Sequence, residues 1–178
     1  KARTFLRKTN SGGSVLTSRA ELTNMPQGLA FLRGHWLSAY ARWLVDDHVR
    51  VRNRQQVELI SMLEVELPEE AVQTRMSEYD LLAYLPGNKH LVWFECKSGS
   101  LSWIEPERLA RSYQTLQSAL EIAGGSTVPV GVCLVPSPAS RKDRATMPKL
   151  RTELAEHGIR LIEICELRSA IHDLLPIS

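Results

Sequence analysis

Residues 77–99 read SEYDLLAYLPGNKHLVWFECKSG and contain two stretches of strand-forming residues separated by a turn. The first stretch, Tyr79 to Leu85, is rich in residues that favour β-strands. Pro-Gly-Asn at 86–88 is typical of a turn, because Pro fixes φ and Gly or Asn accepts positive φ. The second stretch, His90 to Cys96, is mostly apolar, which indicates a strand buried on both faces. We therefore expect an antiparallel β-hairpin.

Three charged residues interrupt this apolar hairpin, namely Asp80, Glu95 and Lys97. Because side chains alternate along a strand, Glu95 and Lys97 are expected on one face. Asp80 opens the first strand and Glu95 closes the second, so these two residues should lie side by side. The sequence thus predicts that two carboxylates and an amine meet at one end of a sheet.

This combination of charges favours a particular chemistry. Two neighbouring carboxylates repel each other, and a divalent cation relieves that repulsion; Mg²⁺ is usually held by one or two carboxylates, water and substrate phosphate. A lysine beside the cation can orient a water molecule or stabilise the charge that develops on phosphorus. The pattern therefore fits metal-dependent hydrolysis of phosphodiesters, and a plain surface ion pair between Glu95 and Lys97 is the alternative interpretation.

Asp80 followed by Glu95-Cys96-Lys97 resembles the core motif of PD-(D/E)xK nucleases. The surrounding residues, 78–80 and 94–99, are most similar to the nuclease domain of CRISPR ancillary nucleases that carry a CARF sensor. The resemblance covers roughly residues 28–175. It implies a restriction-endonuclease-like α/β fold, in which a mixed central sheet is flanked by helices.

The same resemblance implies a Mg²⁺- or Mn²⁺-dependent endonuclease with Asp80, Glu95 and Lys97 as catalytic residues. Asp80, Glu95 and the backbone carbonyl of Cys96 would hold the metal, with Glu78 as an accessory residue. Relatives form homodimers and cut single-stranded nucleic acid after their sensor binds a cyclic oligoadenylate. A DNA or RNA partner, a role in antiviral defence and a sensor domain absent from this chain are therefore implied.

Two helices are expected to contribute further residues. In the helix predicted at 28–44, residues 34–40 resemble a Gly-Gly-Trp-Leu-Glu-x-Tyr motif, but Ser38 stands where many relatives have a metal-assisting glutamate. This departure favours the alternative function, a non-catalytic nucleic-acid-binding or dimerisation module that retains the nuclease fold. In the helix predicted at 105–123, Gln114 and Gln117 are accessory candidates, because relatives direct polar residues of this helix to the active site; an exposed polar face is the other interpretation.

Composition and charge complete the sequence-based expectations. A chain of 178 residues, 43% hydrophobic and 24% charged, suits one globular domain, with an arm or irregular hairpin at 1–27 and the nuclease domain at 28–178. No apolar run has the length of a membrane span and no signal peptide is recognised, so a cytoplasmic protein is expected; Lys at position 1 indicates a processed or excised piece. The three cysteines lack zinc or disulfide spacing and are expected to be buried, reduced thiols.

Positive charge is concentrated in the first third, where residues 1–60 hold ten Lys and Arg against four Asp and Glu. Arg50, Arg52 and Arg54 alternate, so on a strand they would share one face, as a nucleic-acid groove or as a solvated edge. Further strands are expected at 56–67, 128–135 and 159–164. Helices are expected at 148–157 and 167–175, with a charged loop at 141–144.

Overall fold

The computed structural model of the chain describes residues 4–8, 14–18, 36–52, 57–66, 76–125 and 127–176. Contacts within the chain divide it into two units, Lys1–Trp36 and Leu37–Ser178. In the first unit, β1 (Thr4–Lys8) pairs antiparallel with β2 (Ser14–Ser18). A hairpin, one of the two forms expected of the N-terminal arm, is therefore present over these residues.

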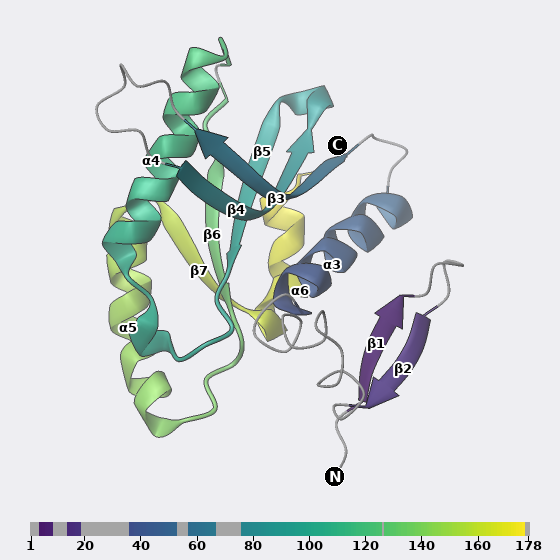
Figure 1. Cartoon of the computed structure of the whole chain (residues 1–178), viewed down its shortest axis with the longest axis vertical. Coiled ribbons are helices and arrows are strands. Elements are labelled where there is room, and N and C mark those ends of the chain that lie inside the picture. Colours follow the sequence, from purple (N-terminus) through teal and green to yellow (C-terminus); the bar gives the residue numbers. More distant parts are fainter. Residues whose placement is uncertain are drawn as a thin grey trace. The chain divides into compact units, whose positions relative to one another are not determined.

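The second unit alternates helices and strands around one sheet (Figure 1). Its elements are α3 (Trp36–Arg52), β3 (Glu58–Glu66), β4 (Met76–Leu85), β5 (His90–Cys96), α4 (Pro106–Ile122), β6 (Val130–Val135), α5 (Arg141–Glu156), β7 (Ile159–Glu163) and α6 (Ile164–Leu174). Two short 3-10 turns, η2 (Pro86–Asn88) and η3 (Leu101–Trp103), lie between strands or before a helix. The order of helices and strands agrees with the sequence-based prediction.

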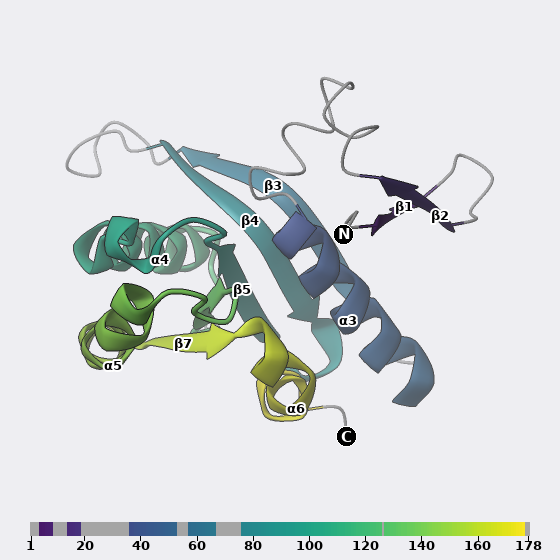
Figure 2. The same cartoon turned by 90° about the horizontal axis from the view of Figure 1, so that it is seen from below.

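The sheet has five strands in the order β3-β4-β5-β6-β7. The pairs β3–β4 and β4–β5 are antiparallel, whereas the pairs β5–β6 and β6–β7 are parallel. Figure 2 shows α4 and α5 on one face of this sheet and α3 and α6 on the other. The predicted α/β fold, a mixed sheet between helices, is therefore confirmed.

Burial on both faces explains why β5 reads as a continuous apolar run. Its residues from Leu91 to Phe94 are buried, since helices cover each side of the sheet. Trp93 packs towards α4, where its ring stacks on Tyr113 with centroids 6.1 Å apart. On the other face, His48 of α3 contacts His172 of α6. The two rings are arranged edge to face, with centroids 4.6 Å apart.

The end of α3 differs from the prediction. The helix continues to Arg52 instead of ending at Leu44, because apolar residues recur at helical spacing up to Val49. The first predicted turns of this helix, residues 28–35, lie outside the described residues. Trp36 and Tyr40 are only half-buried, whereas Leu37 and Ala41 are fully buried.

The start of α5 also differs, because residues 141–144 form its first turn and not a loop. Ser140 is the N-cap, and its hydroxyl oxygen accepts a hydrogen bond of 2.9 Å from the backbone N–H of Asp143. Pro148, taken from the sequence as the start of the helix, lies inside it. The predicted start at Pro148 is therefore wrong. Pro is common in the first turn of a helix, which favoured a start at this residue, but Pro148 lies further inside α5.

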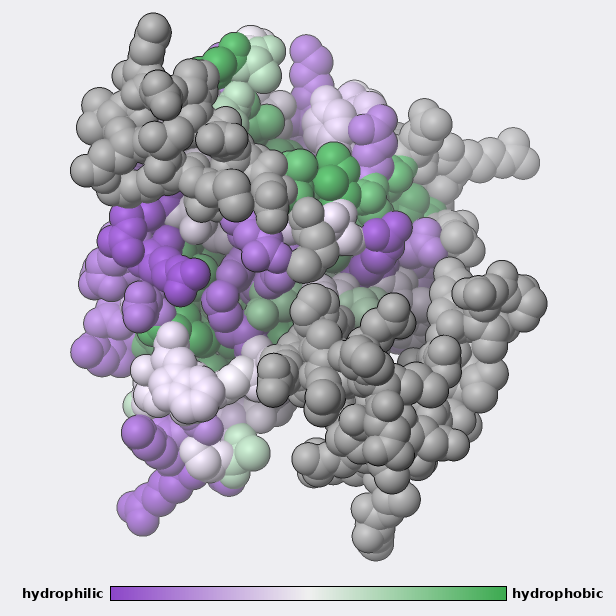
Figure 3. Space-filling model, in the orientation of Figure 1, coloured by the Kyte–Doolittle hydropathy of each residue, from purple (hydrophilic) through white to green (hydrophobic). Residues whose placement is uncertain are grey.

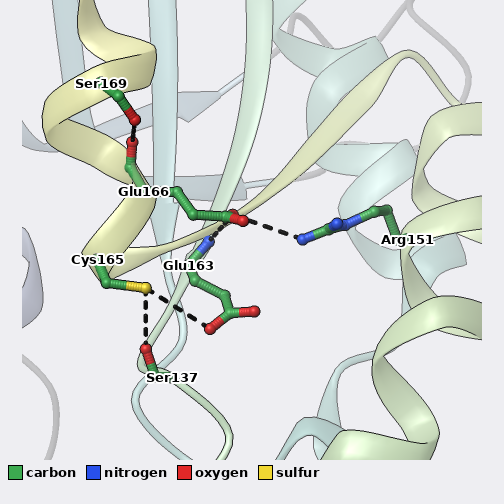
Figure 4. Close-up of polar contacts among 6 residues, drawn as sticks. All are labelled: Ser137, Arg151, Glu163, Cys165, Glu166 and Ser169. Carbon is green, nitrogen blue, oxygen red and sulfur yellow. Dashed lines mark hydrogen bonds and ion pairs between the residues drawn. The ribbon is translucent and has the colours of Figure 1, made fainter.

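The last helix begins at Ile164, three residues before the predicted start, because a capping box holds its first turn. The Glu166 carboxylate accepts a hydrogen bond of 3.1 Å from the Glu163 N–H and lies 3.5 Å from the Arg151 guanidinium of α5 (Figure 4). This turn carries Cys165, which is exposed, contrary to the expectation of a buried thiol. None of the helices in the described ranges is long and apolar enough to cross a membrane.

Removing the cap of α5 should destabilise the protein measurably. We expect Ser140→Ala to lower the free energy of unfolding by about 0.5–2 kcal/mol, because the Asp143 N–H loses its acceptor. Urea denaturation of both proteins checks this. Thr152→Ala is the matched control, since this exposed hydroxyl bonds only to a carbonyl of its own helix. Equal losses for the two variants would contradict the cap assignment.

Candidate active site

The antiparallel pairing of β4 and β5 brings Asp80 and Glu95 to the same place. The ladder runs from Leu85–His90 to Leu81–Phe94, and the next residues on the two strands are Asp80 and Glu95. The sequence predicted that Asp80 opens the first strand of the hairpin. In the structure β4 begins at Met76, so Asp80 lies within the strand. Its Oδ2 atom accepts a hydrogen bond of 2.7 Å from the backbone N–H of Cys96.

The strand β4 is irregular where Asp80 lies. Tyr79 and Leu82 are three positions apart, so a regular strand would direct them to opposite faces. Both nevertheless belong to the core beneath α4, where the Tyr79 hydroxyl donates to the Ser112 carbonyl at 2.8 Å and its ring meets Trp93 at 5.6 Å. This change of alternation is consistent with the position of Asp80, whose carboxylate reaches across to the backbone of β5.

Lys97 completes the group at the end of β5. Its backbone N–H donates to the Leu134 carbonyl of β6 at 2.9 Å, which continues the parallel pairing one residue beyond the strand. Its Nζ atom lies 2.5 Å from Glu95 Oε1. The Lys97 side chain is 36% exposed and that of Glu95 only 12%, so the ion pair reaches from the buried sheet end to solvent. The structure therefore brings Asp80, Glu95 and Lys97 together.

Burial dominates the electrostatics of Glu95. Loss of hydration raises its pKa, the negative charge of Asp80 raises it further, and Lys97 and Arg108 only partly oppose this. For Lys97, burial lowers the pKa, but the attraction and hydrogen bond of Glu95, with the charge of Asp80, outweigh it, so the pKa is raised. In the metal-free chain Lys97 is therefore a cation at neutral pH and donates a hydrogen bond to Glu95.

The neighbouring thiols take no part in this charge distribution. Burial, together with the charges of Asp80 and Glu95, raises the pKa of Cys96 well above its usual range. Burial, with Glu95 as a secondary cause, raises the pKa of Cys133 to about 12. Both thiols stay protonated at neutral pH, so they are poor nucleophiles and poor metal ligands. Cys96 can contribute its backbone carbonyl, as the resemblance implies.

The accessory candidates are placed less favourably. Glu78 is exposed and stands opposite Glu64 of β3. Gln114 is exposed on α4. Gln117 bonds to the Tyr113 side chain, whose hydroxyl donates to the Pro129 carbonyl just before β6 begins. Because Lys97 pairs near the other end of β6, the structure does not bring Gln117 to the candidate site.

The remaining candidates lie on α3. Ser38 is half-buried in its first turn, on the sheet face that α3 and α6 cover. Arg50 and Arg52 belong to the last turn of this helix, so the strand on which they would share one face is not present at these two residues. Arg54 lies outside the described residues.

Sequence reasoning missed Arg108, whose charge lowers the pKa of Glu95. This residue lies in the first turn of α4, which begins with Pro106. A Pro at the first helical position shortly after a strand that ends in charged residues is a signal that could have found it. Asp143 was also missed; it ties the segment after Lys97 to α5 through Ser100 and the backbone of Leu101.

Comparison with known proteins gives a fold and no activity. No family model and no curated protein matches the chain. Among solved structures the chain is similar to protein VC1899 from Vibrio cholerae, with a TM-score of 0.54 and 18% sequence identity. The alignment covers 95% of this chain and 38% of that one. At this identity the similarity supports the α/β fold alone.

The raised pKa of Glu95 predicts a pH effect on stability. Between its ordinary value of 4.5 and the raised value, the folded chain keeps a proton that the unfolded chain has lost. The metal-free parent should therefore lose stability relative to Glu95→Gln as the pH rises through this window, and the difference should be constant below it. Urea denaturation of both proteins in EDTA across this pH range checks the sign. A parent that gains stability over the variant on raising the pH would contradict it.

Proposed function

We propose that this chain is a metal-dependent nuclease that hydrolyses phosphodiester bonds in nucleic acid. One observation carries the proposal: the carboxylates of Asp80 and Glu95 meet at one end of β4 and β5, with the Lys97 amine bonded to Glu95. Two carboxylates, a protonated amine and a solvent-exposed edge are the groups that this hydrolysis requires.

The residues fit a hard divalent cation such as Mg²⁺ or Mn²⁺. Each carboxylate uses one oxygen in the contacts above, and within the described ranges no hydrogen bond is recorded for Asp80 Oδ1 or Glu95 Oε2. The raised pKa of Glu95 reflects a poorly compensated negative charge, which a cation would relieve. No cluster of three or more His, Cys, Asp or Glu side chains is found in the described part of the chain, but Mg²⁺ is often held by two carboxylates.

Each residue then has a distinct task. Asp80 and Glu95 would hold the cation, which supplies Lewis-acid activation of water and phosphate. Lys97, kept protonated by its neighbours, would donate a hydrogen bond to a phosphate oxygen and stabilise the negative charge that grows there. Arg108 adds a second positive charge near Glu95, which favours approach of a polyanion.

The second candidate function is a non-catalytic module that binds nucleic acid or dimerises. The direct ion pair between Lys97 and Glu95 favours it, because such a pair offsets one of the two carboxylate charges without any metal. Ser38, in place of the glutamate seen in the relatives, favours it as well. The intact group of Asp80, Glu95 and Lys97 favours the enzyme.

Cleavage assays distinguish the two functions. Labelled single- and double-stranded DNA and RNA are incubated with the protein in Mn²⁺, in Mg²⁺ and in EDTA. The nuclease proposal predicts shortened products of at least one substrate with metal and none in EDTA. Binding without cleavage under every metal condition would favour the non-catalytic module. Ser38→Glu is then the variant to test for gain of activity.

A further inference from the structure

Trp103 is an exposed aromatic residue next to the candidate active site. It is the last residue of η3, and it is 78% exposed. Among the large hydrophobic residues whose side chains the structure describes, it is more exposed than Trp43, at 51%, and the other exposed ones. A tryptophan in water forgoes the burial that favours it in a core, so its exposure calls for an explanation.

The backbone beneath Trp103 is firmly anchored. Leu101 and Ile104 on either side are buried in the core, and the Trp103 N–H donates to the Ser100 carbonyl at 3.0 Å. The Asp143 carboxylate accepts hydrogen bonds from the Ser100 hydroxyl at 3.1 Å and the Leu101 N–H at 3.2 Å. The turn is thus fixed to α5, and the ring is held outward by a backbone with little freedom.

The Trp103 ring packs against the backbone that follows Lys97. A Cβ atom on Gly99 would lie 3.1 Å from Cε3 of the Trp103 ring, so the ring packs against the bare backbone of this glycine. Gly99 follows Lys97 by two residues, which separates their Cα atoms by at most about 7 Å. A nucleotide next to the phosphate at Lys97 would therefore be within reach of the indole.

We propose that Trp103 is a base-stacking residue that binds an unpaired base beside the phosphate held at Lys97. The inference rests on the proposed function and specifies how its site recognises a substrate. Indole offers a flat, polarisable face on which any base can stack, and such stacking requires a base whose face is open. The ring thereby selects an unpaired stretch of nucleic acid at the cleavage site.

The surroundings of Trp103 favour a nucleic acid over a protein partner. Protein docking sites present contiguous apolar patches, whereas the apolar residues on either side of Trp103, Leu101 and Ile104, are buried in the core. In Figure 3 the coloured atoms on the left, below the grey atoms, where α4 and α5 lie in Figure 1, are mostly hydrophilic. The positive charges of Lys97 and Arg108 both act on Glu95, and positive charge suits a phosphate backbone.

Oligonucleotides with a single abasic site test this role. Labelled single strands of DNA and of RNA, each with the missing base at a different position, are titrated with protein in Ca²⁺, and binding is followed by fluorescence anisotropy. For the parent, the missing base should weaken binding about 5- to 150-fold when it lies at one particular position, counted from the centre of the strand. Trp103→Ala should bind the intact strand as weakly as the parent binds that abasic strand, and should not respond to the missing base.

Two further variants separate stacking from a structural effect. Trp103→Phe should keep a reduced dependence on the abasic position, because phenylalanine also stacks. Trp43→Ala, at the other exposed tryptophan, should behave as the parent. If Trp103→Ala binds as the parent does, with the same abasic profile, the stacking role is wrong. If its molar mass by light scattering falls while its abasic profile is unchanged, the ring serves a protein interface and the inference is overturned.

Failure of the inference is distinguishable from failure of the proposed function. The same strands are incubated in Mn²⁺ to measure cleavage. If the parent cuts these strands, and Trp103→Ala cuts them with the same efficiency and the same dependence on the abasic position, the nuclease function stands and the stacking role is wrong. A parent that binds with the expected profile but cuts nothing retains the stacking role and loses the nuclease function. A parent that neither binds nor cuts single strands overturns the stacking inference.

Discussion

Replacing Lys97 with alanine is expected to slow phosphodiester cleavage about 10²–10³-fold, the usual effect of removing one electrostatic group from an active site. The reason is that the Lys97 amine is held protonated beside Glu95 and Asp80, where the negative charge of a phosphate would develop. Added Mn²⁺ should not restore the rate, because the lost group acts on the phosphate and does not hold the metal.

The fold should survive this change. Lys97 lies just beyond β5 with its side chain 36% exposed, and its backbone bond to Leu134 does not depend on the side chain. Initial cleavage rates at saturating metal, with circular dichroism as a check on folding, measure the effect. Lys149→Ala is the matched control, since this exposed lysine of α5 pairs with Glu153 in its own helix. A Lys97→Ala protein that cuts at the parental rate would place the active site elsewhere.

Replacing Asp80 with asparagine is expected to abolish cleavage at low metal concentration through loss of metal affinity. The amide oxygen can still accept the Cys96 N–H, so the contact between β4 and the end of β5 is kept while the negative charge is removed. Removal of a residue that only orients a metal ligand lowers metal affinity about 10–100-fold. Removal of a direct ligand such as Asp80 should lower metal affinity by more than this. Excess Mn²⁺ should therefore restore part of the activity, in contrast to Lys97→Ala.

The same variant should also change the thermal stability. Burial is the largest cause of the raised pKa of Glu95, and the charge of Asp80 raises it further; removal of that charge relieves the repulsion, so the metal-free protein should melt at a higher temperature than the parent. The rise in melting temperature on adding Mn²⁺ should be smaller, because the stabilisation by a ligand grows with the ratio of its concentration to its dissociation constant, and the variant binds the metal more weakly. Asp47→Asn, an exposed residue of α3, is the control. Parental melting behaviour with and without Mn²⁺ would contradict a metal role for Asp80.

The hairpin could be predicted because its signals are local and agree with one another. The turn at 86–88, the apolar run of β5 and the interrupting charges of Glu95 and Lys97 all indicate the same pairing. That pairing alone brings Asp80 to the end of β5, so a hairpin prediction already contains most of the candidate site. The irregularity of β4 at Asp80 is not visible in the sequence, because it arises from the packing of Tyr79 against α4.

Features set by tertiary contacts could not be predicted. The helix predicted to end at Leu44 continues to Arg52, because apolar residues at helical spacing bury this face of α3 as far as Val49. The charged residues 141–144 were predicted to form a loop, but they form the first turn of α5, which Ser140 caps. The charge of Arg108 acts on Glu95 and the ring of Trp103 packs on Gly99 through tertiary contacts that the sequence does not show.

The central claim, that Asp80 and Glu95 together hold one cation, is tested most directly by counting bound Mn²⁺. Electron paramagnetic resonance of free Mn²⁺, during titration of the metal-free protein, gives the number of sites and their affinity. We expect one site in the parent, and a similar, large loss of affinity in Asp80→Asn and in Glu95→Gln. Binding that is unchanged in either variant, or no binding by the parent, would contradict the claim.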